Sequence, residues 1–150
     1  MAELKVLRGE FPCLRRALDL GDFHPDLAGN VVEVWLNPSR DWMGRFVAHN
    51  ARIIPPSATQ MRGEAKLEEL SEETREQYFA LITEALEAYP LEERNAEDAA
   101  LYSELWDCTA EDAGALLSIE APLTNWLVGR TWDLIGEYRA GRLAKNPMSG

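Results

Sequence analysis

The stretch VVEVWLNPSRDW, from Val31 to Trp42, decides the fold, because a strand pattern changes to a helix pattern within it. Its first half is rich in β-branched and aromatic residues and alternates in polarity, as half-buried strands do. One face of this strand would carry Val32, Val34 and Leu36. The opposite face would carry Val31, Glu33 and Trp35.

The second half of the stretch predicts the start of a helix. Asn37 is a favourable N-cap residue, Pro38 suits the first helical turn, and the charge of Asp41 complements the helix dipole. Apolar side chains then recur at helical spacing, which predicts a short amphipathic helix over residues 38–50. These roles explain all three residues without a catalytic function, and we expect Arg40 to be exposed to solvent.

Working outward, the sequence predicts a β-rich N-terminal part over residues 1–36. Residues 14–20 form a second strand-like segment, and the residues between the two segments are rich in turn formers. The simplest arrangement is an antiparallel pair of residues 14–20 and 31–36 joined by a long loop. A further alternating segment, residues 3–9, predicts another strand.

The rest of the chain predicts helices. Residues 52–63 form a connection in which two consecutive prolines stop regular structure. Helix starts are indicated where a capping residue or a proline precedes apolar residues at helical spacing, at Ser71, Asn95, Thr109 and Pro122. Gly141 is a favourable end for the last of these helices.

The predicted fold class is therefore α+β. It has a small N-terminal antiparallel β-hairpin or sheet followed by a mostly helical bundle of four to five helices. A length of 150 residues predicts a single domain, residues 1–150. Within it, residues 37–143 would form the helical part and residues 144–150 a flexible tail.

The charge of the chain is concentrated in one segment. Of the formal net charge of −11, residues 64–112 contribute −13, with 16 acidic and three basic residues. A polyanion repels nucleic acids and anionic membranes, so we expect direct binding to neither. The acidic segment is either a solvated helical face or a surface for a basic partner.

Few residues suggest chemistry. The cysteines, Cys13 and Cys108, and the histidines, His24 and His49, share no metal-site spacing, so we expect no metal, no cofactor and no catalytic residue. An acidic neighbourhood would raise the thiol pKa of Cys108, which disfavours a nucleophile. His24 is predicted in a loop and His49 in the last turn of a helix. Without an evident signal peptide or membrane-spanning segment, we expect a cytoplasmic protein.

Five tryptophans are many for this length. Core packing accounts for most of them, but tryptophan is also enriched at protein interfaces. Trp126 and Trp132 are six residues apart, about 240° around a helix, so they cannot both face one core. Trp35 lies on the strand face opposite Val34, beside Glu33. The candidate partner-binding residues are therefore Trp35, Glu33, Trp126 and Trp132.

The segments LDLGDFHPDLAGNVVEVWLNPSRDW and APLTNWLVGRTWDLIGEY resemble the small tail assembly chaperones of long-tailed bacteriophages. In that family, a strand pair whose second strand is similar to VEVWLNP precedes an all-helical region. The resemblance covers about residues 14–140. It implies a protein that holds the aggregation-prone tape-measure protein during tail assembly, in the cytoplasm of a bacterial host.

Three classes of function remain open. The first is a non-enzymatic, chaperone-like protein that shields apolar helices of a partner, with an exposed apolar patch rimmed by acidic residues and self-association into a homo-oligomer. The second is an acidic mimic of nucleic acid that inhibits a DNA-binding protein. The third is a small enzyme, which would need a polar cleft with a perturbed acid or histidine.

Overall fold

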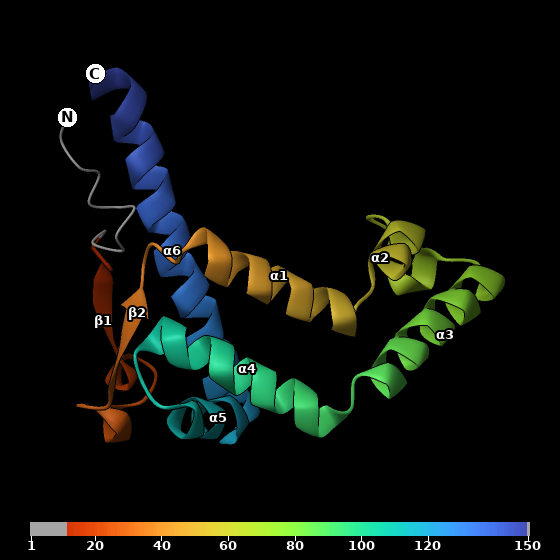
Figure 1. Ribbon diagram of the computed structural model, residues 1–150, viewed down its shortest axis with the longest axis horizontal. Helices are drawn as coiled ribbons and strands as arrows, with labels where there is room; N and C mark the ends of the chain where they lie inside the picture. Colours follow the sequence, from red (N-terminus) through yellow and green to blue (C-terminus); the bar gives the residue numbers. More distant parts are fainter. Residues whose placement is uncertain (1–11, 150) are drawn as a thin grey trace, which may run out of the picture. The chain divides into compact units, whose positions relative to one another are not determined.

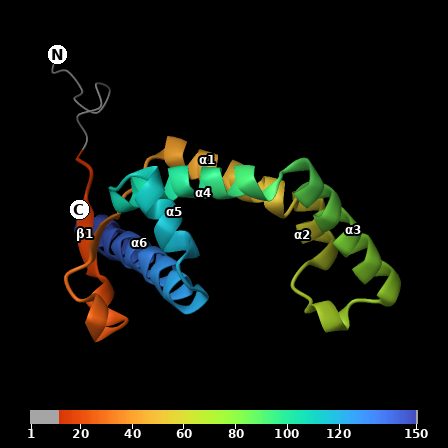
Figure 2. The same cartoon turned by 90° about the horizontal axis from the view of Figure 1, so that it is seen from below.

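The computed structural model describes the backbone of residues 12–149 and the side chains of residues 12–141. It confirms the predicted α+β class: a two-stranded antiparallel sheet is followed by six α-helices in the described residues (Figures 1 and 2). The strand predicted over residues 3–9 lies outside the described residues. No helix in the described part of the chain is both long enough and apolar enough to cross a bilayer.

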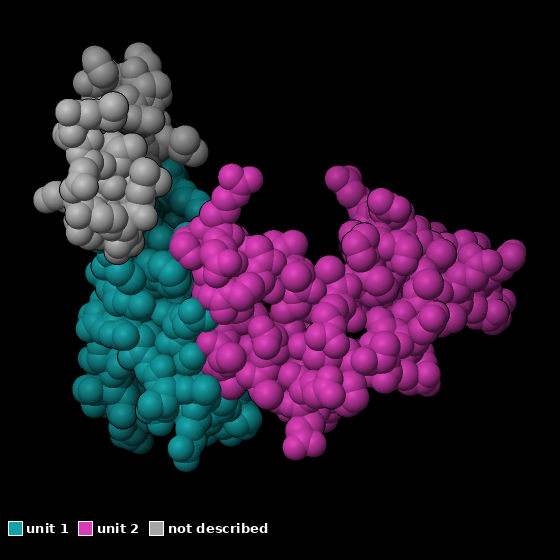
Figure 3. Space-filling model, viewed as in Figure 1, with its two compact units in different colours: residues 1–38, 102–150 teal, residues 39–101 magenta. Residues whose placement is uncertain are grey.

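The chain, for which the sequence predicts a single domain, divides into two compact units (Figure 3). Residues 1–38 and 102–150 form the first unit, and residues 39–101 form the second. The division therefore falls within the quoted stretch Val31–Trp42, after its strand half and just before its helix. We describe the two units separately below.

The hairpin of the first unit confirms the predicted strand pair. β1 (Arg15–Asp19) pairs in antiparallel register with β2 (Val31–Trp35), so that Arg15 lies opposite Trp35. The alternation along β2 is also as predicted, since Val32 and Val34 are buried. Two short 3₁₀ helices, η2 (Leu20–Asp22) and η3 (Pro25–Leu27), shape the long loop.

Asn37 does not cap a helix, contrary to the prediction. Its side-chain oxygen accepts a hydrogen bond from the Leu14 backbone N–H (2.8 Å), and its amide nitrogen donates to the Pro12 carbonyl (3.0 Å). An asparagine amide can satisfy a donor and an acceptor of a neighbouring extended chain together, and here it ties down the segment before β1. The N-cap is Ser39, whose hydroxyl accepts from the Trp42 N–H at 3.0 Å.

The second unit begins with two helices. α1 (Arg40–Ile53) runs past the predicted end at residue 50, and Arg40 is exposed as expected. The predicted irregular connection over residues 52–63 is wrong, because α2 (Pro56–Arg62) forms there. Its proline occupies the first turn, where the missing N–H would have no partner in the helix anyway. The prolines therefore start a helix instead of preventing one.

Two acidic helices complete the second unit and lead into the first. A short 3₁₀ turn, η4 (Leu67–Glu69), precedes α3 (Glu72–Ala88), and the Ser71 hydroxyl caps α3 as predicted. α4 (Leu91–Trp106) begins directly after Pro90, so the predicted start at Asn95 is wrong. Two glutamates in its first turn complement the helix dipole, which favours this earlier start.

The last two helices belong to the first unit. Thr109 caps α5 (Ala110–Ser118) as predicted, accepting a hydrogen bond from the Asp112 N–H at 3.0 Å. α6 (Ala121–Ser149) begins one residue before the expected Pro122. It does not end at Gly141, since one glycine inside a helix costs only about 1 kcal/mol. The backbone of residues 144–149 lies in α6, and the flexibility of residues 144–150 stays a prediction.

Each unit contains a buried tryptophan with a hydrogen-bonded indole. In the second unit, Trp42 donates to the Leu101 carbonyl at 3.0 Å. In the first unit, Trp106 donates to the Thr131 hydroxyl (2.9 Å), which donates in turn to the Leu127 carbonyl (2.7 Å). Trp42, Trp106 and Thr131 are almost fully buried, so these three polar side chains are satisfied without water.

Candidate functional sites

Trp35, the first predicted partner-binding residue, is half-buried on β2. The Arg15 guanidinium lies 5.7 Å from its ring centroid, at the distance of a cation–π contact. Arg15 also donates to the backbone carbonyls of Glu33 (2.8 Å) and Glu104 (3.0 Å). The Trp35 indole N–H is buried and makes no hydrogen bond within the described residues. Arg15 thus contacts both the Trp35 ring and the backbone of the exposed Glu33.

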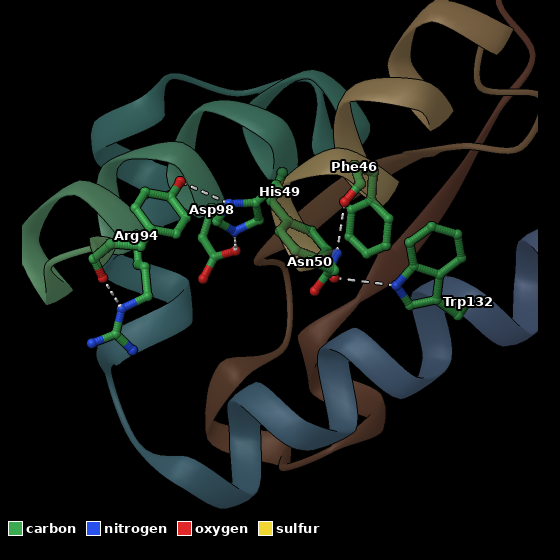
Figure 4. Close-up of polar contacts among 8 residues, drawn as sticks. Phe46, His49, Asn50, Arg94, Asp98 and Trp132 are labelled. Atoms are coloured by element: carbon green, nitrogen blue, oxygen red, sulfur yellow. Dashed lines mark hydrogen bonds and ion pairs between the residues drawn. The ribbon is translucent and has the colours of Figure 1, made fainter. Parts of the chain in front are cut away.

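The other two predicted residues have different neighbours. Both are half-buried on α6. Trp126 packs against Phe23, with ring centroids 5.5 Å apart, while the indole of Trp132 donates to the Tyr102 hydroxyl at 3.2 Å (Figure 4). These contacts agree with the predicted divergence of the two side chains around the helix.

A larger apolar surface lies in the second unit. A hollow of about 540 Å³, which we call the α1–α2 groove, opens where these two helices meet. No charged residue lines it; the lining residues are Val47, Asn50, Ala51, Ile53, Ile54, Pro56, Thr59 and Gln60. Val47 is 61% exposed and Ile54 is 50% exposed, although both are large and apolar. Sequence reasoning missed this groove because it treated residues 52–63 as irregular.

The α1–α2 groove lies in the basic part of an acidic chain. From Trp42 to Gly63 the sequence contains three arginines and no acidic residue. The following segment, residues 64–112, carries the net charge of −13. Two of these arginines, Arg45 and Arg52, line a different hollow beside His49 and Tyr89, and Arg45 is ion-paired with Asp41 at 3.2 Å.

A buried polar cluster in the same unit connects three helical segments (Figure 4). His49 of α1 lies with Nδ1 2.9 Å from the Tyr89 hydroxyl and Nε2 2.6 Å from Asp98 Oδ1. Its side chain is 1% exposed. Tyr89 follows the end of α3, and Asp98 lies on α4. The prediction placed His49 in a final helical turn and missed its partners, which are 40 and 49 residues away.

With Asp98 ionised and the imidazole neutral, these contacts select one tautomer of His49. An ionised carboxylate only accepts, so His49 Nε2 carries the hydrogen shared with Asp98. In the neutral imidazole, Nδ1 is then an acceptor for the Tyr89 hydroxyl. A carboxylate, an imidazole and a hydroxyl in this order could in principle transfer a proton. The cluster is thus the feature nearest to the polar cleft that an enzyme would need.

Tyr89 is poorly suited to act as a nucleophile. Burial raises its pKa above the ordinary value, and the nearby carboxylates of Glu97, Asp98 and Glu93 raise it further, against the opposing effect of Arg52. The Arg52 guanidinium covers its ring at 3.5 Å from the centroid. A protonated, covered tyrosine donates a hydrogen bond but does not attack a substrate. The arrangement is best explained as a buried connection of α1 to α3 and α4.

Cys108 lines a separate hollow of about 290 Å³ in the first unit, with Val31 and Asp112. Burial raises the pKa of its thiol, and Asp112 and Asp107 raise it further, in the predicted direction. The described residues contain no group of three histidine, cysteine, aspartate or glutamate side chains that could hold a metal ion. His24 lies in a loop as predicted, where Nδ1 accepts from the Asp26 N–H at 3.1 Å.

Comparison with known proteins adds no relative: no protein family, curated protein or solved structure matches the chain.

Proposed function

We propose that this protein is a non-enzymatic, chaperone-like binding protein that shields an apolar helical segment of a partner protein. The α1–α2 groove is the observation that carries the proposal. Its volume of about 540 Å³ falls within the usual range of binding pockets, about 300–1,000 Å³. Large apolar side chains exposed at an uncharged hollow favour an apolar occupant, because covering them removes apolar surface from water.

The proposed partner is a phage tape-measure protein. Support for this choice comes from the resemblance of Val31–Trp42 and its surroundings to tail assembly chaperones. The resemblance implies a tape-measure protein that is prone to aggregate before assembly, so its apolar stretches would need to be covered. The proposed location is the cytoplasm of a bacterial host, where tails assemble.

Co-expression with a tape-measure protein encoded beside this gene tests the proposal. We expect the wild-type chain to keep that protein soluble and to co-purify with it. Val47→Glu places a charge in the groove on an exposed helical position, so it should leave the fold intact and return the tape-measure protein to the pellet. Ile119→Glu is the matched control, since Ile119 is 63% exposed in the other unit.

Equal solubility of the tape-measure protein with and without the wild-type chain would contradict the proposal. Loss of solubility with both variants would indicate a general defect and would not implicate the groove. If no tape-measure gene lies beside this one, the acidic-mimic and enzyme functions become the alternatives to test.

A further inference from the structure

β1 has one edge bonded to β2 and one free edge. The Leu20 N–H donates to the Asn30 carbonyl at 2.8 Å, and these two residues continue the register of the strand pair. Residues of an antiparallel strand alternate between bonding to the neighbouring strand and pointing away from it, so the odd-numbered residues of β1 point away from β2. These residues are Arg15, Ala17 and Asp19.

The free edge of β1 makes no backbone hydrogen bond within the described residues. The sheet there consists of two strands only, and the outward N–H and C=O groups of β1 bond to no other described residue. Ala17, at the centre of this edge, is small and exposed. Arg15 and Asp19, at its ends, already contact backbone groups of their own unit, so the backbone and not a free charge defines the edge. An unpaired edge of this kind is a template for another strand.

The free edge of β1 is complementary to itself in one antiparallel register. A two-fold axis at Ala17 sets Ala17 opposite its own copy and Arg15 opposite Asp19 of the second copy, so every outward N–H and C=O of the strand is paired. Centring the pair on Arg16 leaves Asp19 without a partner and sets two arginines opposite each other, which is unfavourable. Centring it on Leu18 leaves Arg15 without a partner.

We propose that β1 pairs in antiparallel register with β1 of a second copy of this chain, about a two-fold axis at Ala17. The two hairpins then form one continuous sheet. The contact is isologous, since both copies use the same edge, so the association stops at a dimer. Five residues bury little surface, and we therefore expect a dimer that dissociates on dilution. This surface lies in the first unit, apart from the α1–α2 groove, and the inference goes beyond the proposed function.

Disulfide trapping tests the register directly. In a background with Cys13→Ser and Cys108→Ser, Ala17→Cys places one thiol of each copy at the two-fold axis. Residues opposite each other in a hydrogen-bonded pair have Cα atoms about 5.5 Å apart, which is within the range that a disulfide spans, about 4.4–6.8 Å. We expect mild oxidation to convert this variant to a covalent dimer.

Arg16→Cys in the same background is the matched control for trapping. Arg16 is also exposed on β1, but the proposed register sets it opposite Leu18 of the second copy. Its two copies are then diagonal neighbours about 7–8 Å apart, which is too far for a disulfide without movement of the backbone. We expect little or no covalent dimer from Arg16→Cys.

Sedimentation equilibrium tests the free edge without a cross-link. Ala17→Pro removes the central outward N–H and keeps the pairing with β2, because proline is tolerated where an edge strand faces solvent. Ala17→Glu sets two like charges opposite each other at the axis and serves as a second variant if the proline variant does not fold. We expect the wild type and Ile119→Glu to dimerise as the concentration rises and both Ala17 variants to stay monomeric, with circular dichroism checking their folding.

Four results would overturn the inference. They are a wild-type chain that stays monomeric up to about 1 mM, where even weak specific pairs form; equal trapping of Ala17→Cys and Arg16→Cys; and a dimer that folded Ala17→Pro or Ala17→Glu leaves unchanged. The fourth is slow exchange of the Ala17 amide that appears only when a tape-measure protein is added, because it would assign the edge to a foreign strand.

Discussion

His49 and Asp98 are joined by a 2.6 Å contact between imidazole Nε2 and carboxylate Oδ1, although 49 residues separate them. The contact holds α1 beside α4, and the other ring nitrogen of His49 reaches Tyr89 after α3. α1 carries half of the lining of the α1–α2 groove. The buried cluster therefore supports the helix on which the proposed binding surface depends.

Tyr89→Phe should lower the free energy of unfolding by about 1–3 kcal/mol, because it leaves His49 Nδ1 buried without its hydrogen-bond donor. Chemical denaturation monitored by circular dichroism measures the change. Tyr78→Phe is the matched control, since the Tyr78 hydroxyl makes no hydrogen bond within the described part of the chain and should be lost at little cost. Equal effects of the two substitutions would show that the cluster contributes nothing beyond packing.

Thr131→Val should destabilise the first unit by a similar amount, about 1–3 kcal/mol. The substitution keeps the shape of the side chain but removes the hydroxyl that accepts a hydrogen bond from the buried Trp106 indole N–H. Thr124→Val is the comparison, because the Thr124 hydroxyl is half-buried and only donates, to the Leu116 carbonyl at 2.7 Å. A Thr131→Val variant as stable as the wild type would contradict the assignment of this bond.

A separate prediction concerns the start of α1, where Ser39 and not Asn37 is the N-cap residue. Ser39→Ala should cost about 1 kcal/mol, because the Trp42 N–H loses its cap. Asn37→Ala should instead speed hydrogen exchange at the Leu14 amide, which donates to the Asn37 side chain. Amide exchange followed by NMR distinguishes the two effects. If the Leu14 amide is equally protected in Asn37→Ala and in the wild type, the hydrogen bond from Leu14 to the Asn37 side chain is contradicted.

The raised pKa of Cys108 predicts slow alkylation. In a Cys13→Ser background, the fraction of thiolate at a given pH should be lower in the folded chain than in the denatured chain. Asp112→Asn removes one cause of the raised pKa, so the midpoint of the pH–rate profile should move to lower pH. A midpoint unchanged by Asp112→Asn, or lower in the folded chain than in the denatured chain, would contradict this account.

Because the pKa of Cys108 is raised in the folded chain, the free energy of unfolding should fall as the pH rises through that pKa. A folded-state pKa above the unfolded value means that Cys108 favours folding fully below the unfolded pKa. That contribution is lost as the pH rises through the folded pKa. Cys108→Ala should therefore reduce the loss of stability on the alkaline side, measured by denaturation across that pH range.

Local sequence signals predicted much of the fold. The strand pair was evident from alternation and turn residues, and Ser71 and Thr109 cap their helices as predicted. One error arose where two residues compete for one role. Asn37 and Ser39 are both good N-caps, and only the position of Leu14 in the folded chain decides between them.

The candidate sites were less predictable because they depend on contacts between distant segments. Nothing local distinguishes His49 from a surface histidine, since Tyr89 and Asp98 lie far along the chain. The α1–α2 groove depends on α2. The sequence did not predict this helix, because two consecutive prolines at its start indicated irregular structure. One signal could have found it: Val47 lies on the face of α1 away from the buried residues Trp42 and His49, and the apolar Ile54 follows the helix as its C-cap residue.

Hydrogen–deuterium exchange on the protein alone and in complex with its tape-measure partner tests the central claim most directly. If the α1–α2 groove holds the apolar segment, amides over residues 47–60 should become more protected in the complex, and Val47→Glu should abolish both the complex and the protection. A complex that leaves residues 47–60 unchanged and protects the hairpin around Trp35 instead would contradict the account.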